Sequence, residues 1–314
     1  MNKKEKKIKV LIVGAGKIGR EYLKILTKKK KFEVNAIIAT SYKNFKKVNF
    51  ITKKKIFTID RNIFIKNSFD LAIIAVPADR TYQLSLKIMK YIKTLLIEKP
   101  PSLSLKHANN LLKKSKIYKN NLFVALNRSY FDSTIQAINI IKKNRNKRFI
   151  EVTDQENVLN AKKAGHSQKV LKKWMYANSI HMVDYFRIFC RGTVRKITHL
   201  NKIKSTFEKN VSISKIFFSS GDIGIYKAFW NLPSKWQVKI IYKNTLIDLF
   251  PLEKISVFEN NIKLNDIKLK KDKFKDGYLN QINDVENFYL FKKNKLVTLK
   301  ENLKTLKLID KLYF

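Results

Sequence analysis

Along the first 126 residues, short apolar runs alternate with stretches in which apolar positions recur three and four residues apart. The short runs are typical of strands buried in a parallel sheet, and the longer spacing indicates amphipathic helices. Strands are expected at residues 8–13, 32–39, 70–76, 94–97 and 121–126, with a further short strand inside 49–59. Helices are expected at residues 18–28, 80–93 and 102–114. This alternation predicts a doubly wound parallel sheet.

The pattern changes after residue 126, where strands follow one another without helices between them. Turn residues such as Ser220-Gly221-Asp222 separate these strands, which favours an antiparallel sheet. The strands are expected at residues 149–153, 194–200, 213–219, 223–231, 236–242 and 245–250, and helices at 133–142, 177–189, 278–291 and 300–313. We therefore predict two domains. Residues 1–125 form the parallel sheet, and residues 126–314 form an α+β domain with an open, largely antiparallel sheet.

Three glycines at G-x-G-x-x-G spacing separate the first expected strand from the first expected helix. Gly14 lets the strand turn sharply, Gly16 lets the backbone approach a pyrophosphate, and Gly19 lets the helix pack closely on the strand. Phosphates would then lie at the N-terminus of the helix, where free N–H groups and the helix dipole favour anions. An ordinary turn is the alternative, but the strand before and the helix after favour a dinucleotide cofactor. Its expected contacts here are Gly14, Ala15, Gly16, Lys17, Ile18 and Gly19.

The end of the second expected strand selects the ribose of such a cofactor. An acidic residue there accepts a hydrogen bond from the 2′-hydroxyl of NAD, whereas small polar and basic residues suit the 2′-phosphate of NADP. This chain has Thr40 and Ser41 at that place, and no acidic residue until well beyond. The sequence therefore favours NADP, with NAD as the alternative.

The formal charge of +43, from 67 Lys and Arg against 24 Asp and Glu, could indicate nucleic acid, an anionic membrane or acidic substrates. However, the lysines are spread along the whole chain, and no nucleic-acid-binding motif accompanies them, so we expect no specific nucleic-acid partner. The single cysteine, Cys190, excludes an internal disulfide and indicates a reducing compartment. No apolar stretch approaches the roughly 18–20 residues that span a bilayer. We expect a cytoplasmic protein without a membrane partner.

Several further motifs give the chain a family resemblance. They are Ala75-Val76-Pro77, Glu98-Lys99-Pro100, Leu126-Asn127-Arg128, His181-Met182-Val183-Asp184, and Trp230-Asn231 with Trp236. Together with the glycines, they resemble those of the Gfo/Idh/MocA oxidoreductases, named for glucose–fructose oxidoreductase and inositol dehydrogenase. The resemblance implies an N-terminal Rossmann domain and hydride transfer between NAD(P) and a hydroxyl of a sugar or polyol. It also implies a homo-oligomer, a dimer or tetramer, formed through the C-terminal sheet. The cofactor contacts that it adds are Ala75, Val76, Pro77, Glu98, Lys99 and Asn127.

Lys99 is the first candidate catalytic residue. Oxidation of a secondary alcohol needs a proton acceptor on the oxygen while hydride leaves the carbon. Lys99 follows a predicted parallel strand, at the edge where ligands of such sheets bind, and a lysine there can act as a general base. The alternative is that Lys99 is one more surface lysine. Glu98 before it and the two prolines after it disfavour this alternative. In the family the Lys99–Pro100 peptide can be cis.

His181 is the second candidate, with Asp184 one helical turn later. A carboxylate beside an imidazole fixes its tautomer and favours its protonated form, as a general acid needs. The alternative is a histidine buried in the core. We expect Lys99, Asn178 and His181 to contact the substrate, and we predict no metal site.

One departure from the family pattern puts the activity in question. Many members carry Asp four positions before this histidine, where the chain has Ala177. The sequence thus predicts an NAD(P)-dependent dehydrogenase or reductase acting on a sugar, sugar nucleotide or polyol, by analogy in surface-polysaccharide synthesis. It leaves open a non-catalytic regulator that senses a dinucleotide or sugar on the same fold.

Overall fold

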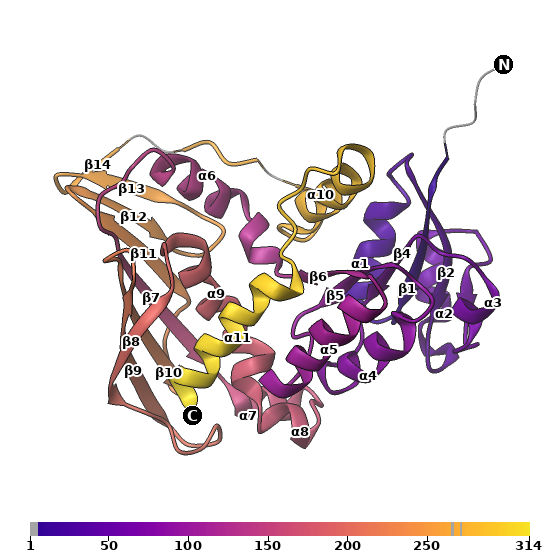
Figure 1. The fold of residues 1–314 in the computed structure, drawn as a ribbon, viewed down its shortest axis with the longest axis horizontal. Coiled ribbons are helices and arrows are strands. Elements are labelled where there is room, and N and C mark those ends of the chain that lie inside the picture. Colours follow the sequence, from indigo (N-terminus) through magenta and orange to yellow (C-terminus); the bar gives the residue numbers. More distant parts are fainter. Residues whose placement is uncertain (1–5, 265–266, 271) are drawn as a thin grey trace. The chain divides into compact units, whose positions relative to one another are not determined.

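The computed structural model describes residues 6–264, 267–270 and 272–314. They form two compact units (Figure 1). The first contains the described residues up to Leu126 together with Lys273–Glu301, and the second contains Asn127–Asp272 with Asn302–Phe314. The sequence pattern predicts a boundary near the same place, after residue 125, but it gives no sign that Lys273–Glu301 returns to the first unit. Hydrophobic periodicity identifies a helix without showing which core it joins.

The first unit is built on a six-stranded sheet of order β3-β2-β1-β4-β5-β6, in which all neighbours are parallel. Its strands are β1 Ile8–Val13, β2 Phe32–Ile38, β3 Phe57–Thr58, β4 Leu71–Ile74, β5 Thr94–Glu98 and β6 Asn121–Ala125. Every residue of β4 and β5 is buried, as apolar runs in a parallel sheet require. The predicted doubly wound sheet is confirmed. The strand order reverses between β1 and β4, and ligands of such sheets bind at the carboxyl ends of the strands beside this switch point.

Helices join these strands. They are α1 Lys17–Leu26, η1 Tyr42–Asn44, α2 Phe45–Ile51, α3 Ile63–Lys66, α4 Ala78–Ile88 and α5 Leu105–Ile117, and α10 Tyr278–Phe291 comes from the returning segment. The face of α1 that packs on the sheet buries Tyr22, Leu23 and Leu26. The strand expected inside residues 49–59 is reduced to β3, because α2 extends to Ile51.

The second unit contains an eight-stranded sheet of order β14-β13-β12-β11-β7-β10-β9-β8. Within the described part of this second sheet, only the central pair β7 and β10 is parallel, so the predicted open, largely antiparallel sheet is confirmed. Its strands are β7 Phe149–Glu156, β8 Val194–Asn201, β9 Asn210–Phe218, β10 Ile223–Trp230, β11 Gln237–Tyr242, β12 Thr245–Leu249, β13 Ser256–Glu259 and β14 Ile262–Lys263. The short β13 and β14 were not expected from the sequence pattern.

One face of this sheet packs against helices of the same unit. The helices are η2 Asn127–Tyr130, α6 Asp132–Ile141, α7 Val158–Lys163, α8 Gln168–Leu171, the π-helical turn η3 Met175–Ser179, α9 Ile180–Phe189 and α11 Leu299–Tyr313. Phe186 of α9 lies against Gly224 of β10, where a Cβ atom would come within 2.7 Å of the Phe186 ring.

The helix expected at residues 177–189 is two elements in the structure, η3 and α9. In the described part of the chain, no helix combines the length and the apolar character needed to cross a bilayer.

Candidate functional site

Two of the three glycines are required by close packing at the end of β1. Gly14 has a φ of +111°, and a Cβ atom on it would lie 2.2 Å from the carbonyl oxygen of Ala75. A Cβ atom on Gly19 would lie 1.8 Å from the carbonyl oxygen of Gly14. Because both obstacles are backbone atoms, a side chain at either position cannot be accommodated by a rotamer change. These glycines bring α1 and the turn after β4 close to β1.

Gly16 differs from the other two glycines, because it is open. Its backbone is extended, with φ −67° and ψ −173°, and a Cβ atom on it would meet no atom within 4 Å. Gly16 is also the N-cap of α1, which has no side-chain cap and no acidic residue in its first turn. The first N–H groups of the helix and its positive dipole end therefore face a space that suits an anion. Lys17 is exposed beside it, and Ile18 is half-buried.

Arg20 connects this turn to the segment that follows β2, a link that the sequence analysis missed. Its Nη1 donates to the carbonyl oxygen of Ala15 at 2.7 Å and to Oδ1 of Asn44 at 2.9 Å. The same segment carries Thr40 and Ser41, which are both exposed. The predicted phosphate and ribose contacts are thus held beside each other at one edge of the sheet.

Ala75, Val76 and Pro77 form the turn between β4 and α4. The amide of Ala75 donates to the carbonyl oxygen of Val13 at 2.8 Å, which fixes the turn against the end of β1. Ala75 and Val76 are half-buried and Pro77 is exposed. Three of the predicted cofactor segments therefore follow the carboxyl ends of the neighbouring strands β2, β1 and β4.

Glu98 and Lys99 lie at the carboxyl end of β5. Glu98 is buried, and its Oε1 lies 2.8 Å from the Tyr22 hydroxyl and 3.2 Å from that of Tyr278. Burial raises the pKa of the Glu98 carboxyl, while the hydrogen bond from Tyr22 and the charge of Lys99 oppose this effect. Tyr278 begins α10, so the returning segment helps to hold Glu98 in place. Lys99 itself is half-buried, and its peptide bond to Pro100 is cis.

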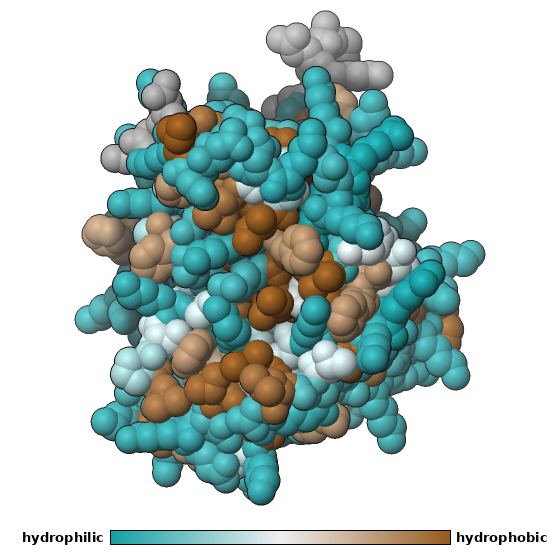
Figure 2. All heavy atoms as spheres, turned by 90° about the vertical axis from the view of Figure 1, so that its left-hand side faces the viewer, coloured by the Kyte–Doolittle hydropathy of each residue, from teal (hydrophilic) through white to brown (hydrophobic). Residues whose placement is uncertain are grey.

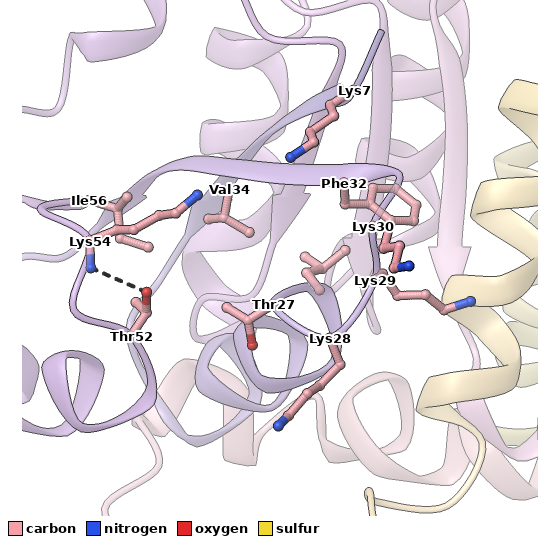
Figure 3. A pocket seen from close by; sticks show the side chains of 11 residues that line it. Lys7, Thr27, Lys28, Lys29, Lys30, Phe32, Val34, Thr52, Lys54 and Ile56 are labelled. Carbon is pink, nitrogen blue, oxygen red and sulfur yellow. Dashed lines mark hydrogen bonds between the residues drawn. The ribbon is translucent and has the colours of Figure 1, made fainter. Parts of the chain in front are cut away.

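A pocket of about 260 Å³ lies at the opposite edge of this sheet (Figure 3). Its walls come from the start of β1 and β2, the end of α1 and the segment before β3. Lysine side chains surround it, namely Lys7, Lys28, Lys29, Lys30 and Lys54, and Lys29 donates to Glu286 at 2.6 Å. Because the glycine turn follows the end of β1, this pocket is not the predicted cofactor site.

In the second unit, Asn178 and His181 lie on the open side of an otherwise buried stretch. From Trp174 to Phe186 these two residues are half-buried and all the others are buried, including Ala177. They are three positions apart across the junction of η3 and α9, so the structure brings them to the same side. Nδ2 of Asn178 donates to Oε2 of Glu156 at 2.8 Å.

Asp184 faces the interior of the second unit. Its carboxylate accepts hydrogen bonds from Nε and Nη2 of Arg187, at 2.8 and 2.7 Å, and from Oγ1 of Thr305 at 2.6 Å. These contacts tie α9 to α11 and favour a structural role for Asp184. Its predicted role in holding the imidazole of His181 stays a prediction.

Other motif residues of the second unit also have clear packing contacts. Asn127 is the first residue of the second unit and is buried. Its contact with a cofactor stays a prediction. The guanidinium of Arg128 lies 4.1 Å from the ring centre of Trp236. Oδ1 of Asn231 accepts from the amide of Val158 at 2.9 Å. Within residues 6–264, 267–270 and 272–314, no three His, Cys, Asp or Glu side chains gather as a metal site requires.

Two buried carboxyl groups of β7, Asp154 and Glu156, were not expected from the sequence pattern. A signal for them exists. Ile150 and Val152 precede them at alternate positions, so the two acids continue the apolar face of the strand. Acidic residues on such a face need partners, and a partner network often marks a functional region.

A parallel sheet of six strands with a G-x-G-x-x-G turn after β1 defines a dinucleotide-binding protein of the Rossmann class. The family model of the Gfo/Idh/MocA oxidoreductases, described as an oxidoreductase family with an NAD-binding Rossmann fold, matches residues 8–126. The comparison with curated protein sequences gives no significant match.

Solved structures extend the likeness over nearly the whole chain. A dehydrogenase from Chromobacterium violaceum is 17% identical with a TM-score of 0.83, covering 98% of this chain and 94% of its own. UDP-N-acetylglucosamine 3-dehydrogenase from Acidithiobacillus ferrooxidans is 12% identical with a TM-score of 0.78, and the match covers 98% of this chain and 96% of that one. An oxidoreductase from Agrobacterium radiobacter, solved in complex with NAD+, L-tartaric acid and magnesium, is 14% identical with a TM-score of 0.75. The match covers 97% of this chain and 94% of that one. At these identities the likeness shows the fold.

Proposed function

We propose that the protein is a cytoplasmic NAD(P)-dependent oxidoreductase that transfers hydride between nicotinamide and a secondary hydroxyl or keto group. The observation that carries this proposal is the placement of Gly16 and Lys99 at one edge of one sheet. An open helix N-terminus and a half-buried lysine both follow the carboxyl ends of strands there. The substrate class that we favour is a sugar, sugar nucleotide or polyol, supported by the fold shared with a UDP-N-acetylglucosamine 3-dehydrogenase. In its narrowest form, the proposal is that the substrate is a sugar nucleotide used for surface polysaccharides.

The residues at this edge fit a dinucleotide. The space beside Gly16, which a Cβ atom would enter, suits a pyrophosphate that the N-terminus of α1 would bind. Thr40 and Ser41 would contact the ribose, and Ala75 to Pro77 would flank the diphosphate from β4. When bound, the cofactor supplies the nicotinamide that accepts or donates the hydride.

Lys99 is the proton-transferring group in this proposal. As a neutral amine its Nζ takes the proton from the substrate hydroxyl during oxidation, and as an ammonium it returns a proton to the oxygen during reduction. Its backbone is held by the neighbouring Glu98, which Tyr22 and Tyr278 anchor. His181 is proposed as a second acid and base, and Asn178 as a substrate contact.

A substrate panel tests the proposed function. UDP- and CDP-sugars, free hexoses and inositols are each mixed with NAD+ or NADP+, and the absorbance of the reduced nicotinamide is followed. We expect turnover with at least one member of the panel. Tight cofactor binding without turnover of any member would instead support the regulator, in which Ala177 marks the loss of catalysis.

We predict that NADPH binds more tightly than NADH, because residues 34–59, which include the end of β2, contain no acidic residue to accept from a 2′-hydroxyl or repel a 2′-phosphate. Thr40→Asp should shift the ratio of the two affinities about tenfold or more toward NADH. Fluorescence titration of both reduced cofactors measures this ratio. Thr27→Asp is the control, because it adds the same charge to the exposed end of α1 at the other edge of the sheet. Equal or tighter binding of NADH by the wild type would overturn the preference.

The open face of the second sheet supports the proposed homo-oligomer. A row of paired apolar residues crosses it from β12 to β9, consisting of Leu246, Ile241, Phe149, Ile223 and Phe217. Figure 2 views the molecule from this side and shows apolar side chains gathered among hydrophilic ones. An exposed apolar patch with a polar rim is typical of a surface that binds another protein, here a second copy of the chain.

Ile241→Lys is expected to dissociate this oligomer into monomers, because it buries an unpaired charge in the middle of the row. Sedimentation velocity at micromolar concentration measures the assembly state. Lys239→Ala, on the same face of β11, is the matched control and should leave the assembly unchanged. A wild-type protein that sediments as a monomer would exclude this interface.

A further inference from the structure

Strand β7 of the second unit carries two carboxyl groups that the proposed reaction does not use. Asp154 and Glu156 are both 0% exposed and lie on the inward face of the strand. They are two residues apart on that face, so their carboxyl groups are neighbours in the interior. Two neighbouring carboxylates in a buried site repel each other, which favours one proton held by the pair.

The partners of Glu156 come from one short segment. Its Oε2 accepts from Nε1 of Trp174 at 2.6 Å and from Nδ2 of Asn178 at 2.8 Å, and its Oε1 accepts from Oγ of Ser179 at 2.7 Å. Trp174 is the N-cap of η3 and Ser179 is its last residue. One carboxyl group therefore holds both ends of the π-helical turn, a kind of turn frequent at functional sites.

Asp154 is held by different elements of the same unit. Its Oδ2 accepts from the Tyr226 hydroxyl at 2.7 Å, and its Oδ1 accepts from Nε1 of Trp236 at 2.9 Å. The hydroxyl of Tyr313 lies 2.6 Å from that of Tyr226 and extends the network to α11. Asp154 thus connects Glu156 to β10, α11 and the residue before β11.

The charges of this cluster balance if the two acids hold one proton. Buried Arg128 supplies one positive charge that acts on both carboxyl groups. Burial raises the pKa of Asp154 to about 6. Burial, together with the charge of Asp154, raises the pKa of Glu156 well above its usual range. One shared proton leaves one negative charge opposite Arg128, and buried charges persist when they are paired in this way.

The network also fixes the orientation of Asn178. Because its Nδ2 donates to Glu156, its Oδ1 is directed elsewhere as an acceptor. Asn178 lies one turn before His181, and these two residues are half-buried in an otherwise buried stretch. A rigidly held amide oxygen at this place can accept from a hydroxyl or an N–H group and cannot donate to a carbonyl.

We propose that Asp154 and Glu156 share one proton and act as the positioning pair of η3, so that Asn178 accepts a hydrogen bond from a hydroxyl or N–H group of the substrate. Ala177 of η3 carries no carboxyl group, and Glu156 of β7 supplies one that contacts the same turn. The substrate contact rests on the proposed function, whereas the shared proton does not.

The three tryptophans of the chain allow the shared proton to be tested without a substrate. The indole N–H of Trp174 contacts Glu156 and that of Trp236 contacts Asp154, whereas buried Trp230 has no hydrogen-bond partner for its Nε1 among the described residues. In a pH titration of the ¹⁵N-labelled protein, we expect the Trp174 and Trp236 resonances to share a step above the ordinary carboxyl range of about 4. The Trp230 resonance should show no such step.

Two substitutions assign this step to the pair. Glu156→Gln or Asp154→Asn should move the step to a lower pH, because the remaining carboxyl group then titrates without a like charge beside it. Glu151→Gln is the matched control, since Glu151 lies on the outward face of β7 and pairs with Lys227. Separate titrations at ordinary carboxyl values would overturn the proposal, as would a Trp236 step that stays at the same pH in Glu156→Gln. If both variants fail to fold, infrared spectra of wild type with ¹³C-labelled Glu decide, by showing or lacking a protonated Glu carboxyl at neutral pH.

The substrate contact has its own readout, with UDP-N-acetylglucosamine as the probe. Asn178→Ala should raise KM about tenfold, as expected for the loss of one hydrogen bond, while kcat stays within about twofold. An unchanged KM or a matching loss of kcat would overturn the acceptor role of Asn178. If wild type turns over no sugar of the panel, the proposed function and this contact both fall. The tryptophan titration still decides on the shared proton.

Discussion

Lys99→Met is expected to lower kcat about a hundredfold or more while the affinity for the reduced cofactor stays near normal. The substitution removes the amine that is proposed to take and return the proton, but keeps much of the volume of the side-chain stem. General acid and base groups contribute roughly 10²- to 10⁴-fold to turnover. Cofactor binding should persist because the proposed diphosphate site, Gly14 to Gly19, follows a different strand from Lys99. Steady-state kinetics and fluorescence titration measure the two quantities on one preparation.

Lys93→Met is the matched control for this experiment. Lys93 is exposed immediately before β5, so it lies at the opposite end of the strand that Lys99 follows. Its substitution should leave both kcat and cofactor affinity unchanged. Normal turnover by Lys99→Met would show that Lys99 is only a surface lysine. A fall in cofactor affinity as large as the fall in kcat would assign it a binding role.

Most of the first unit could be predicted from the sequence, because the features that define it are local. Buried parallel strands are short apolar runs, and the glycines between β1 and α1 stand at a fixed spacing. The bounds of α10, Tyr278–Phe291, are also those expected from periodicity. What periodicity could not give is the contact of Tyr278 with Glu98, because the two residues are far apart in the sequence. Consequently the return of this segment to the first unit was not foreseen.

The second unit shows how contacts between distant elements change a local prediction. Residues 177–189 have helical periodicity, but the first turn is π-helical where Glu156 binds Trp174, Asn178 and Ser179. The spacing of His181 and Asp184 suggests a pair. Arg187 has the same spacing from Asp184, and a guanidinium binds a carboxylate through two charged hydrogen bonds. The sequence alone could not rank these two partners.

Gly16→Ala is expected to weaken cofactor binding at least about tenfold without destabilising the protein. The backbone of Gly16 is one that any residue adopts, and a Cβ atom there meets no protein atom within 4 Å. The free energy of unfolding should therefore stay within about 1 kcal/mol of wild type, or rise slightly because the unfolded chain loses freedom. The added methyl group occupies the space beside the N-terminus of α1, where a pyrophosphate bound as proposed would approach the backbone. Urea unfolding and fluorescence titration with NADPH measure the two effects.

Gly19→Ala is the structural counterpart of this substitution and should have the opposite balance of effects. Its Cβ atom would lie 1.8 Å from the carbonyl oxygen of Gly14, so α1 must move away from the end of β1. Overpacking of this kind costs about 1–3 kcal/mol and more where only backbone can yield, so we expect a loss of about 3 kcal/mol in the free energy of unfolding. If Gly16→Ala destabilises the protein as much as Gly19→Ala does, Gly16 is a packing glycine. If Gly16→Ala leaves NADPH affinity unchanged, the open space beside Gly16 is not the pyrophosphate site, and a cofactor would have to bind elsewhere along this edge of the sheet.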